Sequence, residues 1–151
     1  EWVEPMAHVL AELGAERAWV VHGEGGLDEL ATSGMTHVAS LKDGKVETFE
    51  VTPEDAGLPR CDLEDIKGGD AEFNADALTA LLAGEPSAYR DTVLFTSAAA
   101  LIVAGKADTL KDGAAVAAES IDTGKARAAL DRMIEISHEV IIEEEEDSGD
   151  E

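Results

Sequence analysis

The pattern of apolar and polar residues predicts helices at the start of the chain and throughout its second half. Apolar residues recur at helical spacing over residues 1–13, and Gly14 fits a C-terminal stop. The expected core-facing stripe of this helix is Val3, Met6, Val9, Leu10 and Leu13. The second half predicts four helices: residues 71–82, residues 89–103, a third that Asp108 caps, and a fourth that follows Gly124 and ends near Ile136.

Between the first helix and the later ones, the pattern predicts three strands. A short apolar run with tryptophan and valine favours a buried strand over residues 17–21. Alternation predicts two more strands over residues 36–41 and 45–51, and Asp43-Gly44 between them is a strong signal for a two-residue hairpin turn. Residues 52–55 carry a helix-start signature of a single turn.

This order of elements predicts an α/β fold that is incomplete. It offers one core strand, a β-hairpin and about four C-terminal helices, which would leave a sheet edge or face bare. We therefore expect partner strands to come from upstream sequence or from another chain. The chain also starts at Glu1-Trp2 without an initiator methionine, so we expect a processed or excised piece of a longer protein.

Charge narrows the possible partners. The 151 residues carry 34 acids against 11 bases, a formal net charge of −23. A surface this acidic argues against binding of nucleic acid or of anionic membranes. Ordinary solubility is the favoured explanation of the charge, and adaptation to high salt is the alternative. Because the acids crowd at the C-terminus, we expect a domain over residues 1–137 and an acidic, disordered tail over residues 138–151.

Cysteine content and hydropathy predict the compartment. Cys61 is the single cysteine, so an internal disulfide is excluded and a reducing cytoplasm fits. We expect its thiol to be inert. No apolar run approaches the roughly 20 residues that cross a bilayer, and no signal-peptide pattern opens the chain.

The candidate chemistry lies where the first strand runs into a glycine-rich turn. Gly23, Gly25 and Gly26 allow a sharp turn and a close approach to the backbone, and Asp28-Glu29 follow at the expected start of a short helix near Leu27. Mg²⁺ binds through one or two carboxylates completed by substrate phosphates and water, which suits this pair. Spacing alone favours the alternative that the two acids simply complement a helix dipole.

Histidine placement predicts one further site residue. His22 ends the first strand beside Gly23, where it contacts either substrate or only the loop. The other three histidines, His8, His37 and His138, have no metal-ligand spacing, so a zinc site is not expected. No catalytic triad, Walker loop or dinucleotide fingerprint occurs. The site residues that we predict are therefore His22 and Gly23 for substrate and Asp28 and Glu29 for metal.

Several segments in one order resemble the C-terminal part of the large α/β domain of the anthranilate phosphoribosyltransferase family. They are residues 20–29 (VVHGEGGLDE), 68–70 (GGD) with 74–75 (NA), 81–84 (LLAG), 90–94 (RDTVL), 98–101 (AAAL) and 119–126 (ESIDTGKA). The resemblance runs from about Trp2 to Ile136. It implies a partial phosphoribosyltransferase/nucleoside-phosphorylase-like domain.

The resemblance implies transfer of phosphoribosyl from phosphoribosyl pyrophosphate to the amine of anthranilate, in tryptophan biosynthesis. Asp28 and Glu29 match the aspartate–glutamate pair that helps to hold Mg²⁺ against pyrophosphate in that family. Positioning should supply much of the rate, because an aniline-type amine needs no strong base. The family acts as a homodimer through a helical domain, most of which lies upstream of residue 1.

Two departures from the family pattern qualify these expectations. Thr96-Ser97 stand where the family usually has Asn-Ala, so the resemblance does not predict the local packing around these two residues. The phosphate loop, the other phosphate contacts and the acceptor-binding arginine all lie upstream, so we expect this chain alone to be inactive. A non-catalytic or engineered fragment that acts in folding or assembly is the alternative, and a nucleoside phosphorylase of related fold is a third.

Overall fold

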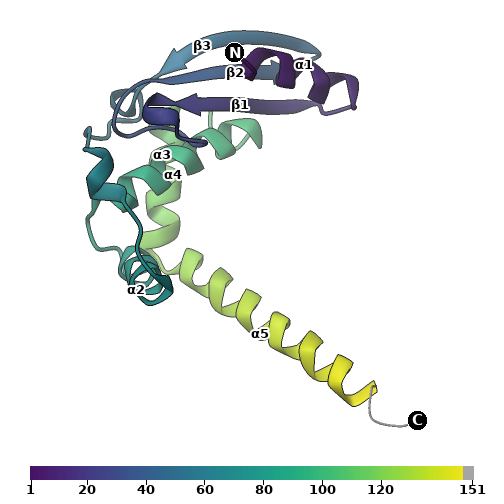
Figure 1. The fold of residues 1–151 in the computed structure, drawn as a ribbon, viewed down its shortest axis with the longest axis vertical. Helices are drawn as coiled ribbons and strands as arrows, with labels where there is room; N and C mark the ends of the chain where they lie inside the picture. The colour runs from purple at the N-terminus through teal and green to yellow at the C-terminus, as the bar shows by residue number, and fades with distance from the viewer. Residues whose placement is uncertain (148–151) are drawn as a thin grey trace.

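A computed structural model describes residues 1–147 of the chain, with side chains as far as residue 138. The elements, in chain order, are α1 (Val3–Glu12), β1 (Arg17–Gly23), β2 (Thr36–Lys42), β3 (Lys45–Val51), α2 (Ala71–Leu82), α3 (Ala88–Val103), α4 (Leu110–Asp122) and α5 (Lys125–Asp147), with three short 3₁₀ turns at Glu24–Gly26, Pro53–Ala56 and Leu63–Ile66. Figure 1 shows the strands and α1 at one end of the molecule and α5 extending from the other. The predicted α/β class is confirmed.

The three strands form one antiparallel sheet in the order β1-β2-β3. The predicted hairpin is confirmed: Asp43 (φ 52°) and Gly44 (φ 73°) both occupy the left-handed region, as a type I′ turn requires. The single strand of the sequence analysis joins this hairpin, because Val21 pairs with Val38 and Gly23 with Thr36. Among the described residues, β1 and β3 are therefore the two edges of the sheet.

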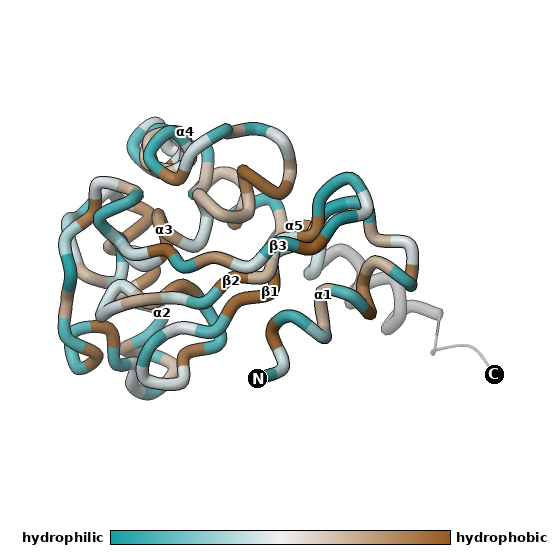
Figure 2. Tube along the Cα trace, turned by 90° about the horizontal axis from the view of Figure 1, so that it is seen from above, coloured by the Kyte–Doolittle hydropathy of each residue, from teal (hydrophilic) through white to brown (hydrophobic). Residues whose placement is uncertain are grey.

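Helices cover both faces of the sheet. Figures 1 and 2 show α1 on one side of the strands and α3 with α4 on the other. On the α3/α4 side, Val38 packs into a core with Phe95 and Ala98, and Trp19 meets Phe49 edge to face at 5.3 Å. The helices α3 and α4 cross closely at Gly113, where a Cβ atom would lie only 2.8 Å from the Cα of Ala98.

The helix α1 is present as predicted, but its predicted core stripe is only partly correct. Ala7 is fully buried and Val3 and Leu10 are half-buried, so these residues face the sheet. Met6, Val9 and Leu13 from the predicted stripe are instead exposed, together with Trp2. Hydrophobicity alone assigned the larger side chains to the core, whereas close packing of the helix on β1 and β2 selects the small Ala7.

The helices of the second half follow the prediction closely, with two corrections. The residue that caps α4 is Thr109, whose Oγ1 accepts a hydrogen bond from the backbone N–H of Asp112 at 3.1 Å, and not Asp108. The helix α5 does not end near Ile136 but continues to Asp147. Residues 148–151 of the predicted tail lie outside the described residues, and the separate role of residues 138–151 stays a prediction.

Local interactions stabilise the part of α5 that lies before Ile136. Ion pairs one turn apart, Arg127–Asp131 at 2.9 Å and Arg132–Glu135 at 3.0 Å, support the exposed part of the helix. Glutamate, which is frequent in the later part of α5, is also among the stronger helix formers. Of the helices that the structure describes, none combines the length and apolar character that crossing a membrane requires.

Candidate functional site

The glycine-rich turn after β1 closes on itself. The N–H of Gly23 donates to the carbonyl of Leu27 at 2.9 Å, and these two residues form an isolated β-bridge. Gly25 (φ 81°) and Gly26 (φ 84°) take the left-handed conformation that this tight return needs. The turn therefore places Leu27 beside the end of β1, and Asp28 and Glu29 follow directly after it.

No helix starts near Leu27, so the predicted short helix is wrong. A helix there would need the Leu27 carbonyl to accept from the N–H of Ala31. That carbonyl accepts from Gly23 instead, and the N–H of Ala31 donates to Thr36 Oγ1 at 2.8 Å. Asp28 and Glu29 consequently lie on bends of an extended loop, and the helix-dipole alternative for these acids does not apply.

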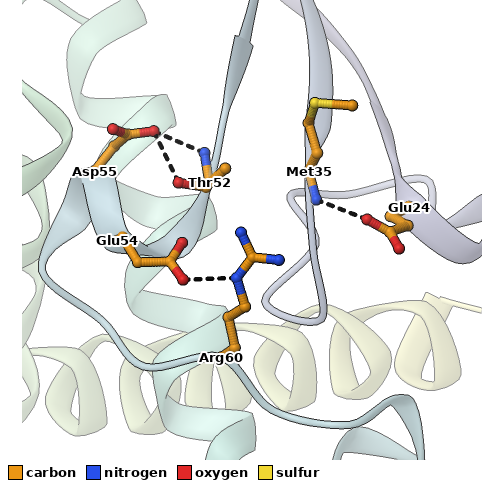
Figure 3. A network of polar contacts seen from close by, with 6 residues as sticks. All are labelled: Glu24, Met35, Thr52, Glu54, Asp55 and Arg60. Carbon is orange, nitrogen blue, oxygen red and sulfur yellow. Dashed lines mark hydrogen bonds and ion pairs between the residues drawn. The ribbon is translucent and has the colours of Figure 1, made fainter.

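Glu24 closes the loop over residues 24–35 at its far end. Its backbone N–H donates to the carbonyl of Met35 at 2.8 Å, and its Oε2 accepts from the Met35 N–H at 3.1 Å (Figure 3). The Glu24 carboxylate lies where a Cβ on Gly34 would be, so a side chain at that position would displace the carboxylate from Met35. This role of Glu24 was missed in the sequence, because the two partners are 11 residues apart and share no motif.

A buried chain of hydrogen bonds anchors the same loop to α3. Thr32 and Thr92 are both buried and their hydroxyl oxygens lie 2.7 Å apart. Thr92 Oγ1 donates to the Ala88 carbonyl at 3.0 Å, so Thr32 is the donor to Thr92. The Cys61 thiol, 3.2 Å away, then donates to Thr32 Oγ1. Cys61 thus has a structural role, because its thiol is the first donor in this series of hydrogen bonds.

The two predicted metal ligands lie between these anchors. Asp28 is exposed and Glu29 is partly buried, while the following residues Leu30, Ala31 and Thr32 are at most 2% exposed. Burial, and secondarily the negative charge of Asp28, raises the pKa of Glu29 above its ordinary value. A nearby cation would offset the part of this penalty that comes from the charge of Asp28.

The two predicted substrate residues come together at the end of β1. His22 is exposed and pairs in register with His37 of β2, whose Nδ1 lies 3.1 Å from the Glu50 carboxylate. Gly23 is buried, and a Cβ there would lie 2.7 Å from the carbonyl oxygen of Glu29. Glycine at this position therefore sets the distance between the end of the strand and the carboxylate loop.

The Gly23→Ala substitution is expected to displace this loop. The added methyl group would overlap the Glu29 backbone and the Ala31 side chain, at 2.7 and 2.9 Å, so the loop must move or the chain loses about 1–3 kcal/mol of stability. Chemical denaturation and amide chemical shifts of residues 27–32 would measure both effects. Gly14→Ala is the control for the chemical shifts: its positive φ makes it costly as well, but an added Cβ meets no neighbouring atom, so the shifts of residues 27–32 should not change. Unchanged shifts around Glu29 would contradict the prediction.

A second polar pair flanks the loop. Arg60 donates from Nε to Glu54 Oε1 at 2.6 Å (Figure 3). This hydrogen bond, together with the charges of Glu54 and Glu24, raises the pKa of the Arg60 guanidinium group. The hydrogen bond from Arg60 is the main reason why the pKa of Glu54 falls to about 2. Beside it, Asp55 Oδ2 accepts from both the N–H and the hydroxyl of Thr52, at 2.8 and 3.1 Å, which caps the predicted single turn.

The ion pair between Arg60 and Glu54 predicts a pH effect of definite sign. A carboxylate whose folded pKa is lowered contributes stability above its unfolded pKa, and this contribution is lost as pH falls toward about 2. We expect the carboxyl resonance of Glu54 to titrate near pH 2, and at a clearly higher pH, closer to its ordinary value of 4.5, in an Arg60→Gln variant. Lys67→Gln, which removes an exposed pair with Glu64 at 3.3 Å, should leave Glu54 unchanged. An unaltered Glu54 midpoint in Arg60→Gln would refute the assignment.

The described side chains do not complete a metal site on their own. Among them, no three His, Cys, Asp or Glu residues are close enough together to hold a metal ion. Two hollows lie elsewhere, one of about 520 Å³ between the start of α1 and β3, and one of about 330 Å³ between α2 and the start of α3. Neither is lined by His22, Gly23, Asp28 or Glu29. The pair of carboxylates is thus an incomplete, open donor set.

Comparison with known families gives a match over most of the chain. Residues 1–127 match the model of the glycosyl transferase family, a/b domain. The chain is 59% identical over 138 residues to an anthranilate phosphoribosyltransferase of Rhodopseudomonas palustris, which covers 91% of this chain and 41% of that protein. A protein of the same name from a Chelativorans species is 56% identical, with 91% and 40% covered. The chain thus spans about two fifths of these relatives.

Solved structures show the same fold. Anthranilate phosphoribosyltransferase of Thermus thermophilus superposes with a TM-score of 0.78 at 42% identity, covering 87% of this chain and 38% of that one. The enzyme of Saccharomyces cerevisiae in complex with phosphoribosyl pyrophosphate and Mg superposes with a TM-score of 0.73 at 26% identity, covering 79% of this chain and 34% of that one.

Thr96, one of the two residues that depart from the family pattern, lies inside the protein. Its Oγ1 is buried and has no hydrogen-bond partner among the described atoms.

Proposed function

This chain belongs to the glycosyl transferase family as part of its a/b domain, and on that premise we propose that it forms part of an enzyme that transfers phosphoribosyl from phosphoribosyl pyrophosphate to anthranilate. The proposal draws its substrates from relatives that are up to 59% identical and that are named for this reaction. Because the chain spans only about two fifths of their length, we propose that it contributes one portion of the site and is inactive alone.

The observation that carries the proposal is the anchored loop that presents Asp28 and Glu29. The Gly23–Leu27 bridge holds one end of the pair, and the buried segment from Leu30 to Thr32 holds the other. Their backbone is thus fixed while the Asp28 side chain stays exposed. Preorganised carboxylates on a rigid loop are what a metal-dependent leaving-group site requires.

We propose that Asp28 and Glu29 hold Mg²⁺. Two adjacent carboxylates without further protein ligands fit Mg²⁺, which usually keeps several waters and is completed by substrate phosphates. When bound, Mg²⁺ would neutralise the charge that gathers on pyrophosphate as it leaves. The raised pKa of Glu29 supports this role, since a carboxylate destabilised by burial and by Asp28 gains most from a cation.

We propose that His22 and Gly23 lie against substrate. The exposed imidazole of His22 can donate to phosphate or hydroxyl oxygens, and the glycine turn that follows lets a ligand approach the backbone. Both residues are at the end of β1, adjacent to the carboxylate loop. The chemistry they support is orientation of the ribosyl donor, and no residue of this chain is proposed as an acid or base in the transfer.

Reconstitution tests the proposal. The part of the Rhodopseudomonas palustris relative that precedes its matched segment would be co-expressed with this chain, and anthranilate-dependent release of pyrophosphate would be measured with and without Mg²⁺. We expect Mg²⁺-dependent activity only when both polypeptides are present. A complex that forms but releases no pyrophosphate would overturn the proposal and favour a non-catalytic role in assembly.

Two further properties of the whole enzyme follow from the family. We propose that it is a homodimer, with contacts made mainly by sequence outside this chain, and that it acts in the cytoplasm. The half-buried thiol of Cys61, held as a hydrogen-bond donor to Thr32, fits a reducing compartment. Sedimentation of the reconstituted enzyme would measure its assembly state.

A further inference from the structure

The hydroxyl group of Thr92 joins α3 to the carboxylate loop (residues 24–35). Its oxygen lies 2.7 Å from that of Thr32, and the two residues are 3% and 0% exposed. A hydroxyl group that loses its partner in the interior has no water to bond instead, so the full cost of its desolvation remains. This contact therefore holds the loop more firmly than an exposed hydrogen bond of the same length could.

The helix α3 fixes the position of this hydroxyl group. Thr92 Oγ1 donates to the carbonyl of Ala88 one turn earlier, at 3.0 Å, so its lone pairs are left to accept from Thr32. Further along the same helix, Phe95 is fully buried in the core that joins α3 to the sheet. The loop is thus attached to a part of α3 that close packing holds in place.

The connection from Thr32 back to the two carboxylates is short and buried. The two residues that separate Thr32 from Glu29, Leu30 and Ala31, are 2% and 0% exposed. On the other side, the carbonyl oxygen of Glu29 lies 2.7 Å from where a Cβ on Gly23 would be, so the Glu29 backbone packs against the end of β1. We therefore expect a movement of Thr32 to be transmitted to Glu29 and not absorbed between them.

We propose that Thr92 is a positioning residue for the metal site: through Thr32 it fixes the carboxylate loop, so that the affinity of Asp28 and Glu29 for a divalent cation depends on α3. This inference rests on the proposed function, because it takes these two carboxylates as metal ligands. Thr92 is too deeply buried to touch metal or substrate itself, so its effect passes through the loop alone.

Cation affinity depends on the loop because two like charges must face one ion. Asp28 and Glu29 are adjacent and their negative charges oppose one another, and Asp28 is exposed. A loop that is held in place presents both carboxylates to the ion without further ordering, whereas a loose loop loses conformational freedom when it binds. Freeing Thr32 from α3 should therefore weaken cation binding while the rest of the fold persists.

The test is a titration of the chain with Mn²⁺, which takes the same oxygen ligands as Mg²⁺ and broadens the NMR signals of nearby amides. We expect the amides of residues 28 and 29 to broaden, at a Mn²⁺ concentration that rises about three- to tenfold in Thr92→Val, where a methyl group replaces the hydroxyl group. Thr92→Ser keeps the hydroxyl group and should restore the affinity. Thr96→Val is the matched control, since it removes from the same helix a buried hydroxyl group without a hydrogen-bond partner among the described residues.

A double-mutant cycle separates this role from general destabilisation. If Thr92 acts through Thr32, the chain with both Thr32→Val and Thr92→Val should bind Mn²⁺ about as weakly as the weaker single variant, and not by the product of the two effects. Urea denaturation checks that each chain folds, and Thr92→Ala, which suits a helix, replaces Thr92→Val if that variant does not. Broadening beside Asp43, at the hairpin turn, measures unspecific binding to acids and should be equal in all chains.

The outcomes distinguish the positioning role from the metal assignment. Equal Mn²⁺ affinity of Thr92→Val and the unmodified chain would overturn the positioning role and leave the metal ligands intact. Additive losses in the double variant, or an equal loss in Thr96→Val, would overturn it as well, because the hydroxyl groups would then act only through stability. Absence of broadening at residues 28 and 29, or its persistence in Asp28→Asn/Glu29→Gln, would contradict the proposed metal ligands and the positioning role with them.

Discussion

Replacing Asp28 by asparagine is expected to lower the rate of pyrophosphate release by the reconstituted enzyme about 10²- to 10³-fold. Neutralisation of leaving-group charge by a metal ion is worth several kcal/mol, and about 1.4 kcal/mol corresponds to a tenfold change in rate. The substitution keeps the shape of the side chain and removes the charge that the loop presents. The measurement is the initial rate as a function of Mg²⁺ concentration, with excess Mg²⁺ partly restoring activity.

Asp43→Asn is the matched control for this prediction. It removes the same charge at the hairpin turn, where the left-handed conformation of Asp43 also suits asparagine. We expect its activity and Mg²⁺ dependence to equal those of the unmodified chain. Equal activity of Asp28→Asn and Asp43→Asn would show that Asp28 is not a metal ligand, even if the reconstituted enzyme is active.

Replacing Phe95 by alanine is expected to cost about 3–5 kcal/mol of unfolding free energy. Phe95 is completely buried at the centre of the core that joins α3 to the sheet, in contact with the cluster around Val38 and Ala98. Its truncation leaves a cavity between the sheet and the helix that anchors the carboxylate loop through Thr92. Urea denaturation followed by circular dichroism would measure the loss.

Phe73→Ala removes the same side chain from the surface of α2, where phenylalanine is 56% exposed, and should cost no more than about 0.5 kcal/mol. If Phe95→Ala does not fold at all, Phe95→Leu provides an intermediate that keeps part of the volume, and its unfolding midpoint should lie below that of Phe73→Ala. Equal stability of Phe95→Ala and Phe73→Ala would contradict the core assignment.

Elements defined by local signals were predicted well. The bounds of α2 agree with the structure, and the hairpin turn at Asp43-Gly44 has the backbone conformation that its sequence requires. Asp70 caps α2 by accepting from the Phe73 N–H at 2.9 Å, and Asn74 bonds the backbone of Gly69. Such interactions span five residues or fewer, so they can be read from adjacent letters.

The site divides between what local sequence and tertiary contact determined. The order of segments was enough to single out His22, Gly23, Asp28 and Glu29, because strand end, glycine turn and carboxylates are contiguous in the chain. Their roles in binding stay predictions. Sequence also implied an unfinished sheet, and the structure identifies β1 as one of its bare edges.

The tertiary structure alone decided how the loop is held and which side of α1 is buried. The loop is not helical because the N–H of Ala31 donates to Thr36 Oγ1. It is anchored by the hydrogen bond between the hydroxyl groups of Thr32 and Thr92, which are 60 residues apart in the sequence. The helix α1 buries Ala7 because a small side chain permits close packing on the sheet. Hydrophobic patterning reports only how apolar a face is, whereas these outcomes depend on hydrogen-bond partners and shapes that distant segments provide.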